Sequence, residues 1–281
     1  MHITLLGTGS PIPIPERAGT GVYVDVDGEP LLIDCGPGVV NRMIEFGIDP
    51  GRIETLLFTH HHVDHDADFF QFAVVSWSFG REELTVYGPD GSGRLIDALH
   101  DLYAEDLDYR RRMGYPEGGM AIDHEEVSDG LVAETDRWRI EATPVDHSIE
   151  TYGYRIEAVE SGATVTVSGD TRAIPAVADL ASGSDVLIHD CCVAPVAEDT
   201  TADPPLPARL AEPLPSDHRD ELLRTHPTPA EAGQIAADAG VETLVLTHLL
   251  PYRDPMAIHE EASAVFDGEV IVGEDGMVIE P

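Results

Sequence analysis

The stretch Thr59–His65, which reads THHHVDH, gives the most direct indication of the fold and function of this 281-residue chain. It contains the pattern H-x-H-x-D-H, filled by His60, His62, Asp64 and His65. The apolar run Thr55–Thr59 leads into it and predicts a buried strand. Side chains after such a strand emerge at the carboxyl edge of an α/β sheet, where sites form. Imidazole and carboxylate groups bind zinc and similar cations, so a metal site is favoured over a solvated His-rich loop.

Three further segments place polar side chains after predicted strands. His147 follows IEATPVD, Asp170 follows TVTVSG, and His248 follows TLVLT. Each one alone is weak evidence, because a single polar residue beside a strand is more often structural. Their shared placement strengthens all three, and together with the H-x-H-x-D-H residues they would suffice for two metal ions and one bridging carboxylate.

The rest of the chain alternates short apolar runs with helical patterns, which predicts an α/β fold. One helix is expected over Thr228–Ala239, with Thr228 as N-cap, Glu231 as its capping-box partner and Gly240 at the end. Strands are expected at Ile3–Leu6, Gly21–Val26, Pro30–Asp34, Thr55–Thr59, Thr85–Tyr87, Thr164–Ser168, Val186–His189 and Thr243–Thr247, and a second helix at Pro37–Phe46.

An internal similarity relates two of these segments. Residues 52–62 read RIETLLFTHHH and residues 240–250 read GVETLVLTHLL. Two related half-domains, each a sheet covered by helices, would produce this pattern. Chance similarity between two buried strands is the alternative.

Two regions are expected to be excursions from a single domain that spans residues 1–281. Residues 104–125 carry Arg110, Arg111 and Arg112 and then a Gly/Pro-rich stretch, while residues 195–229 are rich in proline. Long loops in compact domains often form walls or lids of sites. The three arginines would clamp an anion over the metals or, alternatively, form a solvated helix face.

Composition restricts the function classes. The chain has 53 acidic and 16 basic residues, a formal charge of −37, and all its basic residues are arginine. Such a charge disfavours binding to nucleic acid or anionic membranes. We expect a halophilic protein, because molar salt shortens the Debye length to about 3 Å and screens the carboxylates; an acidic mesophilic protein is the alternative.

No membrane span or signal peptide is expected from the sequence. Three cysteines, Cys35, Cys191 and Cys192, show no paired spacing, so a disulfide framework is not expected. A cytoplasmic location fits these features.

The chain resembles the metallo-β-lactamase fold hydrolases, in the branch that holds the tRNA 3′-processing endonucleases (ribonuclease Z type) and arylsulfatase-like enzymes. The motifs that carry the resemblance are LLGTGSPIPIPERAGTG, LLIDCGPG, FTHHHVDH, VYGP, VDHSIETYGYRIE, VSGDTR, VLIHD and LVLTHLLP. The resemblance implies a four-layer αβ/βα sandwich with two zinc ions at one edge, other divalent transition metals remaining possible. It implies that His60, His62 and His147 hold one ion, Asp64, His65 and His248 hold the other, and Asp170 bridges them.

The resemblance also implies catalytic roles. His226 matches the family histidine that protonates the leaving oxygen, and Asp190 would orient it. Asp190 stands where the family has Glu, and Pro227 stands where it has Ser. Asp64 could accept the proton of a water that the metals activate to hydroxide. His189 either belongs to this motif or is a core histidine.

Several functions remain open at this point. Only 22 residues separate His147 from Asp170, which leaves no room for the basic arm of tRNA-processing members. We therefore expect a hydrolase of small anionic phosphodiesters or sulfate esters. The alternatives are a tRNA 3′-processing endoribonuclease, with residues 104–125 as its RNA-binding patch, a lactonase, and a non-catalytic metal-binding subunit. The family resemblance also makes a homodimer possible.

Overall fold

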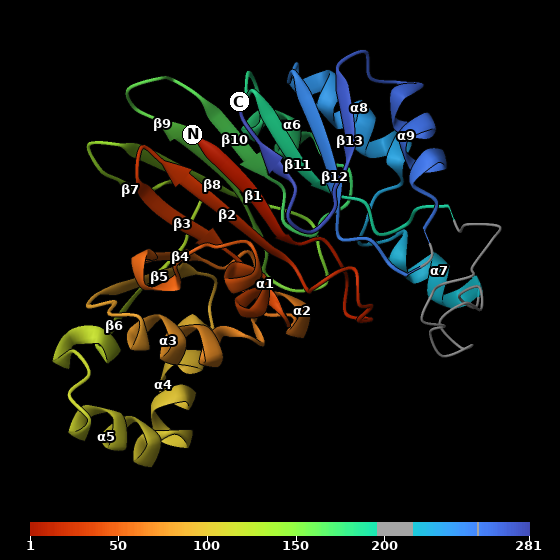
Figure 1. Cartoon of the computed structure of the whole chain (residues 1–281). Helices are drawn as coiled ribbons and strands as arrows, with labels where there is room; N and C mark the ends of the chain where they lie inside the picture. The colour runs from red at the N-terminus through yellow and green to blue at the C-terminus, as the bar shows by residue number, and fades with distance from the viewer. Residues whose placement is uncertain (196–215, 252) are drawn as a thin grey trace.

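A computed structural model describes residues 1–195, 216–251 and 253–281 (Figure 1). Residues 196–215, the larger part of the expected excursion at 195–229, lie outside the described residues. Within the described ranges, no helix is long and apolar enough to cross a membrane. The expectation of a single domain over residues 1–281 stays a prediction.

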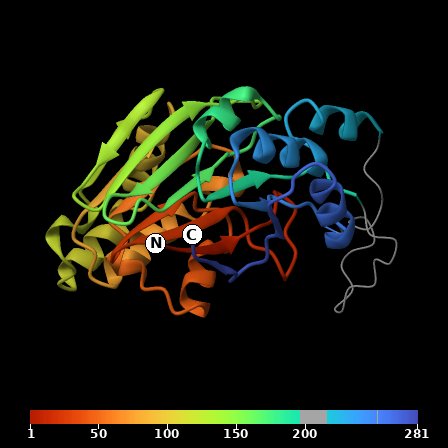
Figure 2. The ribbon, with the colours of Figure 1, turned by 90° about the horizontal axis from the view of Figure 1, so that it is seen from above.

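The described strands form two seven-stranded sheets that pack face to face (Figures 1 and 2). The first sheet has the order β14-β1-β2-β3-β4-β5-β6 and the second the order β13-β12-β11-β10-β9-β8-β7. The strands of the first sheet are β1 (His2–Gly7), β2 (Gly21–Val26), β3 (Glu29–Ile33), β4 (Thr55–Leu57), β5 (Leu84–Gly88), β6 (Ile122–Glu126) and β14 (Val278–Ile279). Those of the second are β7 (Gly130–Glu134), β8 (Trp138–Pro144), β9 (Tyr152–Ala158), β10 (Thr164–Val167), β11 (Val186–Asp190), β12 (Thr243–Thr247) and β13 (Glu269–Val272).

Both faces of the central strands are buried, which explains their continuous apolar runs. Leu57 points into the core between the sheets, whereas Leu56 packs against the helices of the first sheet. In the second sheet Val245 points into the same central core, and Leu244 packs under the helices on the other side. Side chains alternate between faces along a strand, so one apolar run serves two cores.

Helices cover the outer face of each sheet and complete the expected four-layer αβ/βα sandwich (Figure 2). The helices that accompany the first sheet are α1 (Val39–Glu45), α2 (Val63–Asp66), α3 (Phe69–Ser78), α4 (Ser92–Leu102) and α5 (Ala104–Arg112), with 3-10 turns η1 (Pro50–Arg52) and η2 (Glu117–Met120). Those that accompany the second are α6 (Pro175–Leu180), α7 (Ser216–Leu222), α8 (Pro229–Ala239) and α9 (Pro255–Ser263).

The internal similarity between residues 52–62 and 240–250 corresponds to equivalent positions in the two sheets. β4 lies between β3 and β5, and β12 lies between β11 and β13, with parallel pairing on both sides in each case. The carboxyl ends of both strands lead directly into the predicted metal ligands. The two half-sheets therefore contribute to the candidate site from corresponding strand ends.

The sequence predicted several boundaries and missed others. The capping box of α8 is present, with Thr228 and Glu231 bonded reciprocally, and Gly240 at φ 70° ends the helix. The expected excursion at 104–125 contains α5, and its last residues belong to β6. The sequence did not predict β6, because it is an edge strand in which only Ile122 is buried.

Candidate metal centre

The H-x-H-x-D-H stretch follows β4 and runs into the short helix α2, which contains Asp64 and His65. The expected strand Thr55–Thr59 ends two residues early, at Leu57, although the Phe58 amide still donates to the Tyr87 carbonyl of β5 at 2.8 Å. The Tyr154 hydroxyl donates to the Phe58 carbonyl at 2.7 Å, and the Tyr152 amide donates to the Thr59 carbonyl at 3.0 Å. The loop is thus tied across the sandwich to the strand that follows His147.

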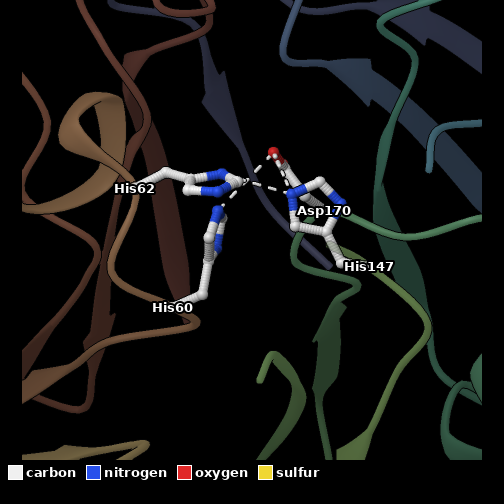
Figure 3. A group of neighbouring side chains, drawn as sticks. All are labelled: His60, His62, His147 and Asp170. Carbon is white, nitrogen blue, oxygen red and sulfur yellow. Dashed lines mark hydrogen bonds and ion pairs between the residues drawn. The ribbon is translucent and has the colours of Figure 1, made fainter. Parts of the chain in front are cut away.

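One group of candidate ligands combines both halves of the molecule (Figure 3). Ligand atoms of four side chains lie within 4.8 Å of one another: His60, His62, His147 and Asp170. His147 Nε2 lies 3.2 Å from His62 Nδ1 and 3.8 Å from Asp170 Oδ2. His60 and His62 reach this point from the first sheet, and the other two come from loops of the second.

A second group lies beside the first. Ligand atoms of Asp64, His65 and His248 also lie within 4.8 Å of one another. His248 Nε2 is 3.0 Å from Asp64 Oδ2, while Asp170 Oδ2 is 3.3 Å from His248 Nε2 and 3.4 Å from His65 Nε2. One oxygen of Asp170 therefore faces histidines of both groups, as a bridging carboxylate would require.

The donor atoms fit divalent metal binding. His60 is fully buried, yet its Nε2 makes no hydrogen bond to the described residues and lies 3.8 Å from Asp170 Oδ2, too far for such a bond. Buried polar atoms are normally paired, so this nitrogen points to a missing partner. Imidazole nitrogens with carboxylate oxygens are the ligands that divalent transition metals prefer.

The carboxylates of the centre favour positive charge on the groups around them. Burial opposes the charged form of Asp170, but the neighbouring His248 and His65 outweigh it and hold its pKa well below the usual range. Burial also opposes protonation of His65, yet Asp170 and Asp34 outweigh it and raise its pKa to about 10. At His60 burial dominates and lowers the pKa.

Asp34 was missed as a site residue, although it lies in the quoted motif LLIDCGPG. The His65 Nδ1 proton is donated to Asp34 Oδ2 at 2.7 Å, and the Thr59 amide and hydroxyl each donate to the same carboxylate at 2.8 Å. Asp34 has φ 58°, a left-handed backbone that nothing in its local sequence predicts. It orients His65 so that Nε2 faces Asp64 and Asp170.

The second half of the site uses unusual backbone conformations. His248 has φ 60°, and Gly169, which precedes Asp170, has φ 63°. A Cβ atom on Gly169 would lie 2.9 Å from the Tyr152 carbonyl oxygen. His147 is held differently, because its Nδ1 donates to the Thr225 carbonyl at 3.3 Å.

His226 and Asp190 form a buried pair beside both groups. His226 Nδ1 donates to Asp190 Oδ2 at 2.6 Å. The His226 ring stacks on His248 at 5.3 Å between centroids and meets His147 edge-on at 5.0 Å. Burial opposes protonation of His226, but Asp190 outweighs it and raises its pKa, while the His226 charge helps lower the pKa of Asp190 to about 2 despite burial.

The residues on either side of Asp190 in the sequence are buried as well. His189 is a fully buried residue whose Nδ1 donates to the Asp190 carbonyl at 2.9 Å, and it joins neither candidate ligand group. Cys191 packs in the core under the helices of the second sheet. Cys192 lies instead within 4.8 Å of ligand atoms of His226 and His248.

The arginines of α5 lie away from this centre. Arg110 pairs with Asp106 and Arg111 pairs with Asp108, each at 2.8 Å on the same helix. Figure 1 places α5 beside α4 and remote from α2, the helix that continues the ligand loop. The arrangement favours a solvated helix face over an anion clamp.

Comparison with known proteins identifies the superfamily. The family model described as "Beta-lactamase superfamily domain" matches residues 30–249. Among curated proteins, the ribonuclease Z of Mycobacterium marinum (strain ATCC BAA-535 / M) is 32% identical over 287 aligned positions, which cover 98% of this chain and 96% of the relative. The ribonuclease Z of Mycobacterium avium (strain 104) is 33% identical with the same coverage.

Solved structures share the fold. The metallo-beta-lactamase fold protein YhfI from Bacillus subtilis superposes with a TM-score of 0.75 at 22% identity and covers 100% of this chain and 99% of its own. Human tRNase Z, short form, superposes with a TM-score of 0.70 at 23% identity and the same coverage. The chain therefore belongs to the beta-lactamase superfamily of metal-dependent hydrolases and, within it, to the ribonuclease Z family.

Proposed function

We propose that this chain is an endoribonuclease that processes the 3′ end of precursor tRNA with two divalent cations, which we take to be zinc. The observation that carries the proposal is the similarity to proteins named ribonuclease Z over nearly the full length of both partners. This similarity favours the endoribonuclease alternative over the small-ester hydrolase that the sequence led us to expect.

The short interval between His147 and Asp170 no longer counts against an RNA substrate. It is filled by the hairpin of β9 and β10. The alignment with the Mycobacterium marinum protein spans 287 positions and covers 98% of this chain, so any segment that the relative adds within it is short. The absence of an arm therefore does not distinguish this chain from its relatives.

The proposed ligand sets follow the two groups of side chains. His60, His62 and His147 would hold one cation, and Asp64, His65 and His248 the other, with Asp170 between them. The distances of 3.3 to 3.8 Å from Asp170 Oδ2 to four histidine nitrogens support a shared carboxylate. When bound, two such cations supply positive charge for the phosphoryl oxygens and acidify a water molecule.

The remaining steps are assigned to side chains of this chain. His226 would donate its Nε2 proton to the departing oxygen, since its other nitrogen is bonded to Asp190. Asp190 would hold the ring in position and stabilise its charged form. Asp64 would accept the proton released by the attacking water, because its carboxylate and that of Asp170 both lie beside His248 Nε2, at 3.0 and 3.3 Å.

A precursor-tRNA assay with end-labelled RNA tests the function. We expect cleavage at one position near the 3′ end of the mature sequence, with an unstructured RNA of equal length left intact. Asp170→Ala should abolish cleavage. An intact precursor under conditions in which the metal-loaded protein hydrolyses a bis(nitrophenyl) phosphate would overturn the tRNA substrate and favour a small-phosphodiester hydrolase.

The test depends on the ionic conditions. We also propose that the protein works in molar salt, since its formal charge of −37 would otherwise favour unfolding by self-repulsion. The melting temperature should rise from dilute buffer to several molar KCl as screening increases. A melting temperature that is independent of salt would contradict this proposal and leave the endoribonuclease proposal standing.

A further inference from the structure

His61 lies inside the ligand stretch but faces away from the ligand groups. Its Nδ1 lies 3.1 Å from Asp66 Oδ2 and its Nε2 lies 3.0 Å from Ser92 Oγ. Both ring nitrogens are thus bonded to side chains that belong to neither ligand group. The ring also packs against Phe58, at 5.4 Å between centroids. His61 is therefore anchored rather than free to bind a metal.

The anchor belongs to a tight turn between β5 and α4. Ser92 is buried, and its hydroxyl also lies 3.0 Å from the Pro89 carbonyl oxygen, which closes the turn. Gly91 has φ 118°, and a Cβ atom there would lie 3.1 Å from the His61 ring. The turn can therefore approach the ring this closely because it has glycine at this position.

The same turn also contacts the segment that carries His147. The Asp90 amide donates to Glu150 Oε2 at 3.0 Å, and the Tyr152 hydroxyl donates to the other carboxylate oxygen of Glu150 at 3.2 Å. Residues 88–92 consequently bond to two loops that lie in different halves of the sandwich. Each of these loops carries candidate ligands of the first group.

We propose that residues 88–92 act as a strap that fixes the loop carrying His60 and His62 relative to the loop carrying His147. His61 is the positioning residue of this strap. The inference rests on the proposed ligand roles of His60, His62 and His147. His61 separates His60 from His62, so fixing its ring limits how far the two flanking imidazoles can move. Outer-shell partners of metal ligands commonly change metal affinity by 10- to 100-fold.

The experiment measures zinc dissociation constants by competition with a chromophoric chelator. His61→Ala and Ser92→Ala should each weaken zinc binding at one of the two sites by about 10-fold. Zinc binding at the other site should stay nearly unchanged. The double variant should lose no more than the stronger single variant, because both changes break one linkage. The Co²⁺-substituted protein should show a changed visible absorption spectrum for one ion only.

Matched variants separate positioning from general destabilisation. Asp66→Asn keeps an acceptor for the His61 ring and should retain zinc affinity, whereas Asp66→Ala should lose it as His61→Ala does. His259, which lies 3.5 Å from Ser263 on the exposed face of α9, provides a His/Ser pair away from the site. His259→Ala should leave both dissociation constants unchanged.

The outcomes distinguish this inference from the proposed function. If the wild-type chain binds no zinc or other divalent ion, the proposed function falls and the inference with it. If the wild type binds two ions and His61→Ala, Ser92→Ala and Asp66→Ala bind them as tightly, only the strap is overturned. Equal losses for Asp66→Asn and Asp66→Ala would also overturn it, because the hydrogen bond would then not be the cause.

Discussion

The two halves of the sandwich supply their candidate ligands in different ways. The first half places His60, His62, Asp64 and His65 within six consecutive residues, whereas the second half supplies His147, Asp170 and His248 from three separate loops. In the first set, His65 is held by a hydrogen bond to the side chain of Asp34, which also accepts the Thr59 amide. The second depends on left-handed backbone at Gly169 and His248. Local sequence therefore defines one half of the site, and chain topology defines the other.

Asp170→Ala should have the largest effect, because it removes a carboxylate oxygen that lies beside histidines of both ligand groups. We expect zinc binding to weaken at both sites by more than the roughly 100-fold that the loss of an outer-shell partner can cost. Metal content after gel filtration and calorimetric titration would measure this. A variant that keeps one full-affinity site would show that this site does not depend on Asp170.

Asp34→Ala tests the side-chain scaffold of the first half. It leaves the Thr59 amide, the Thr59 hydroxyl and His65 Nδ1 without their acceptor inside the protein. Unsatisfied buried groups cost about 1–3 kcal/mol each, so chemical denaturation should show a clear loss of stability. Zinc affinity should fall by about 10- to 100-fold at the site that includes His65. Asp34→Asn keeps one acceptor oxygen and should lose less stability and less zinc affinity than Asp34→Ala. Equal losses in the two variants would assign the effect to the charge of Asp34.

The sequence predicted the clustered ligands better than the scaffold that holds them. The H-x-H-x-D-H pattern after a buried strand indicated a metal site, and the structure brings these residues together with His147, Asp170 and His248. Those three could be added only through shared placement at strand ends and the family motifs. Nothing in the local sequence indicates that Asp34 has a positive φ and accepts hydrogen bonds from Thr59 and His65, because these contacts cross between neighbouring strands.

Edges of the fold were also hard to predict. β6 contains one buried residue, and β7 contains none, so neither shows the alternation that marks a strand with one buried face. The central strands and α8 were predicted well, since burial and capping leave clear patterns in sequence. The expected preference for small esters was inferred from the short interval between His147 and Asp170, whereas the comparisons point to relatives named ribonuclease Z.

Gly169→Ala tests the backbone scaffold of the second half. A left-handed conformation costs an L-residue about 1–2 kcal/mol, and the added Cβ would also press on the Tyr152 carbonyl oxygen. We expect reduced stability and a shift of Asp170 that weakens zinc binding at both sites. Gly162→Ala is the matched control, because Gly162 has φ 75° but open space around it. Gly162→Ala should lose stability but keep its zinc affinity. Equal zinc affinities in Gly169→Ala and Gly162→Ala would show that the second half of the site does not need the left-handed backbone at Gly169.

Thr228→Ala should have the smallest effect and tests whether α8 positions His226. Thr228 caps α8, and its hydroxyl accepts the Glu231 amide at 3.3 Å. Loss of such a cap costs about 1 kcal/mol, equivalent to roughly 2–4 °C in melting temperature for a chain of this size. Asp254→Ala removes the corresponding cap of α9, where the Asp254 carboxylate accepts the Met256 amide at 2.9 Å, and should cost a similar amount.

The two cap variants should differ in catalysis rather than in stability. Thr228 lies two residues after His226, whereas no candidate catalytic residue lies as close to Asp254. If the helix end helps to place His226, Thr228→Ala should lower kcat for precursor tRNA a few-fold, and Asp254→Ala should not. Because the 2.6 Å bond to Asp190 also fixes the ring, the loss should stay well below that of His226→Ala. Equal kcat values in both cap variants would mean that Asp190 alone positions His226, so that side-chain hydrogen bonds hold the catalytic group of the second half as they hold the ligands of the first.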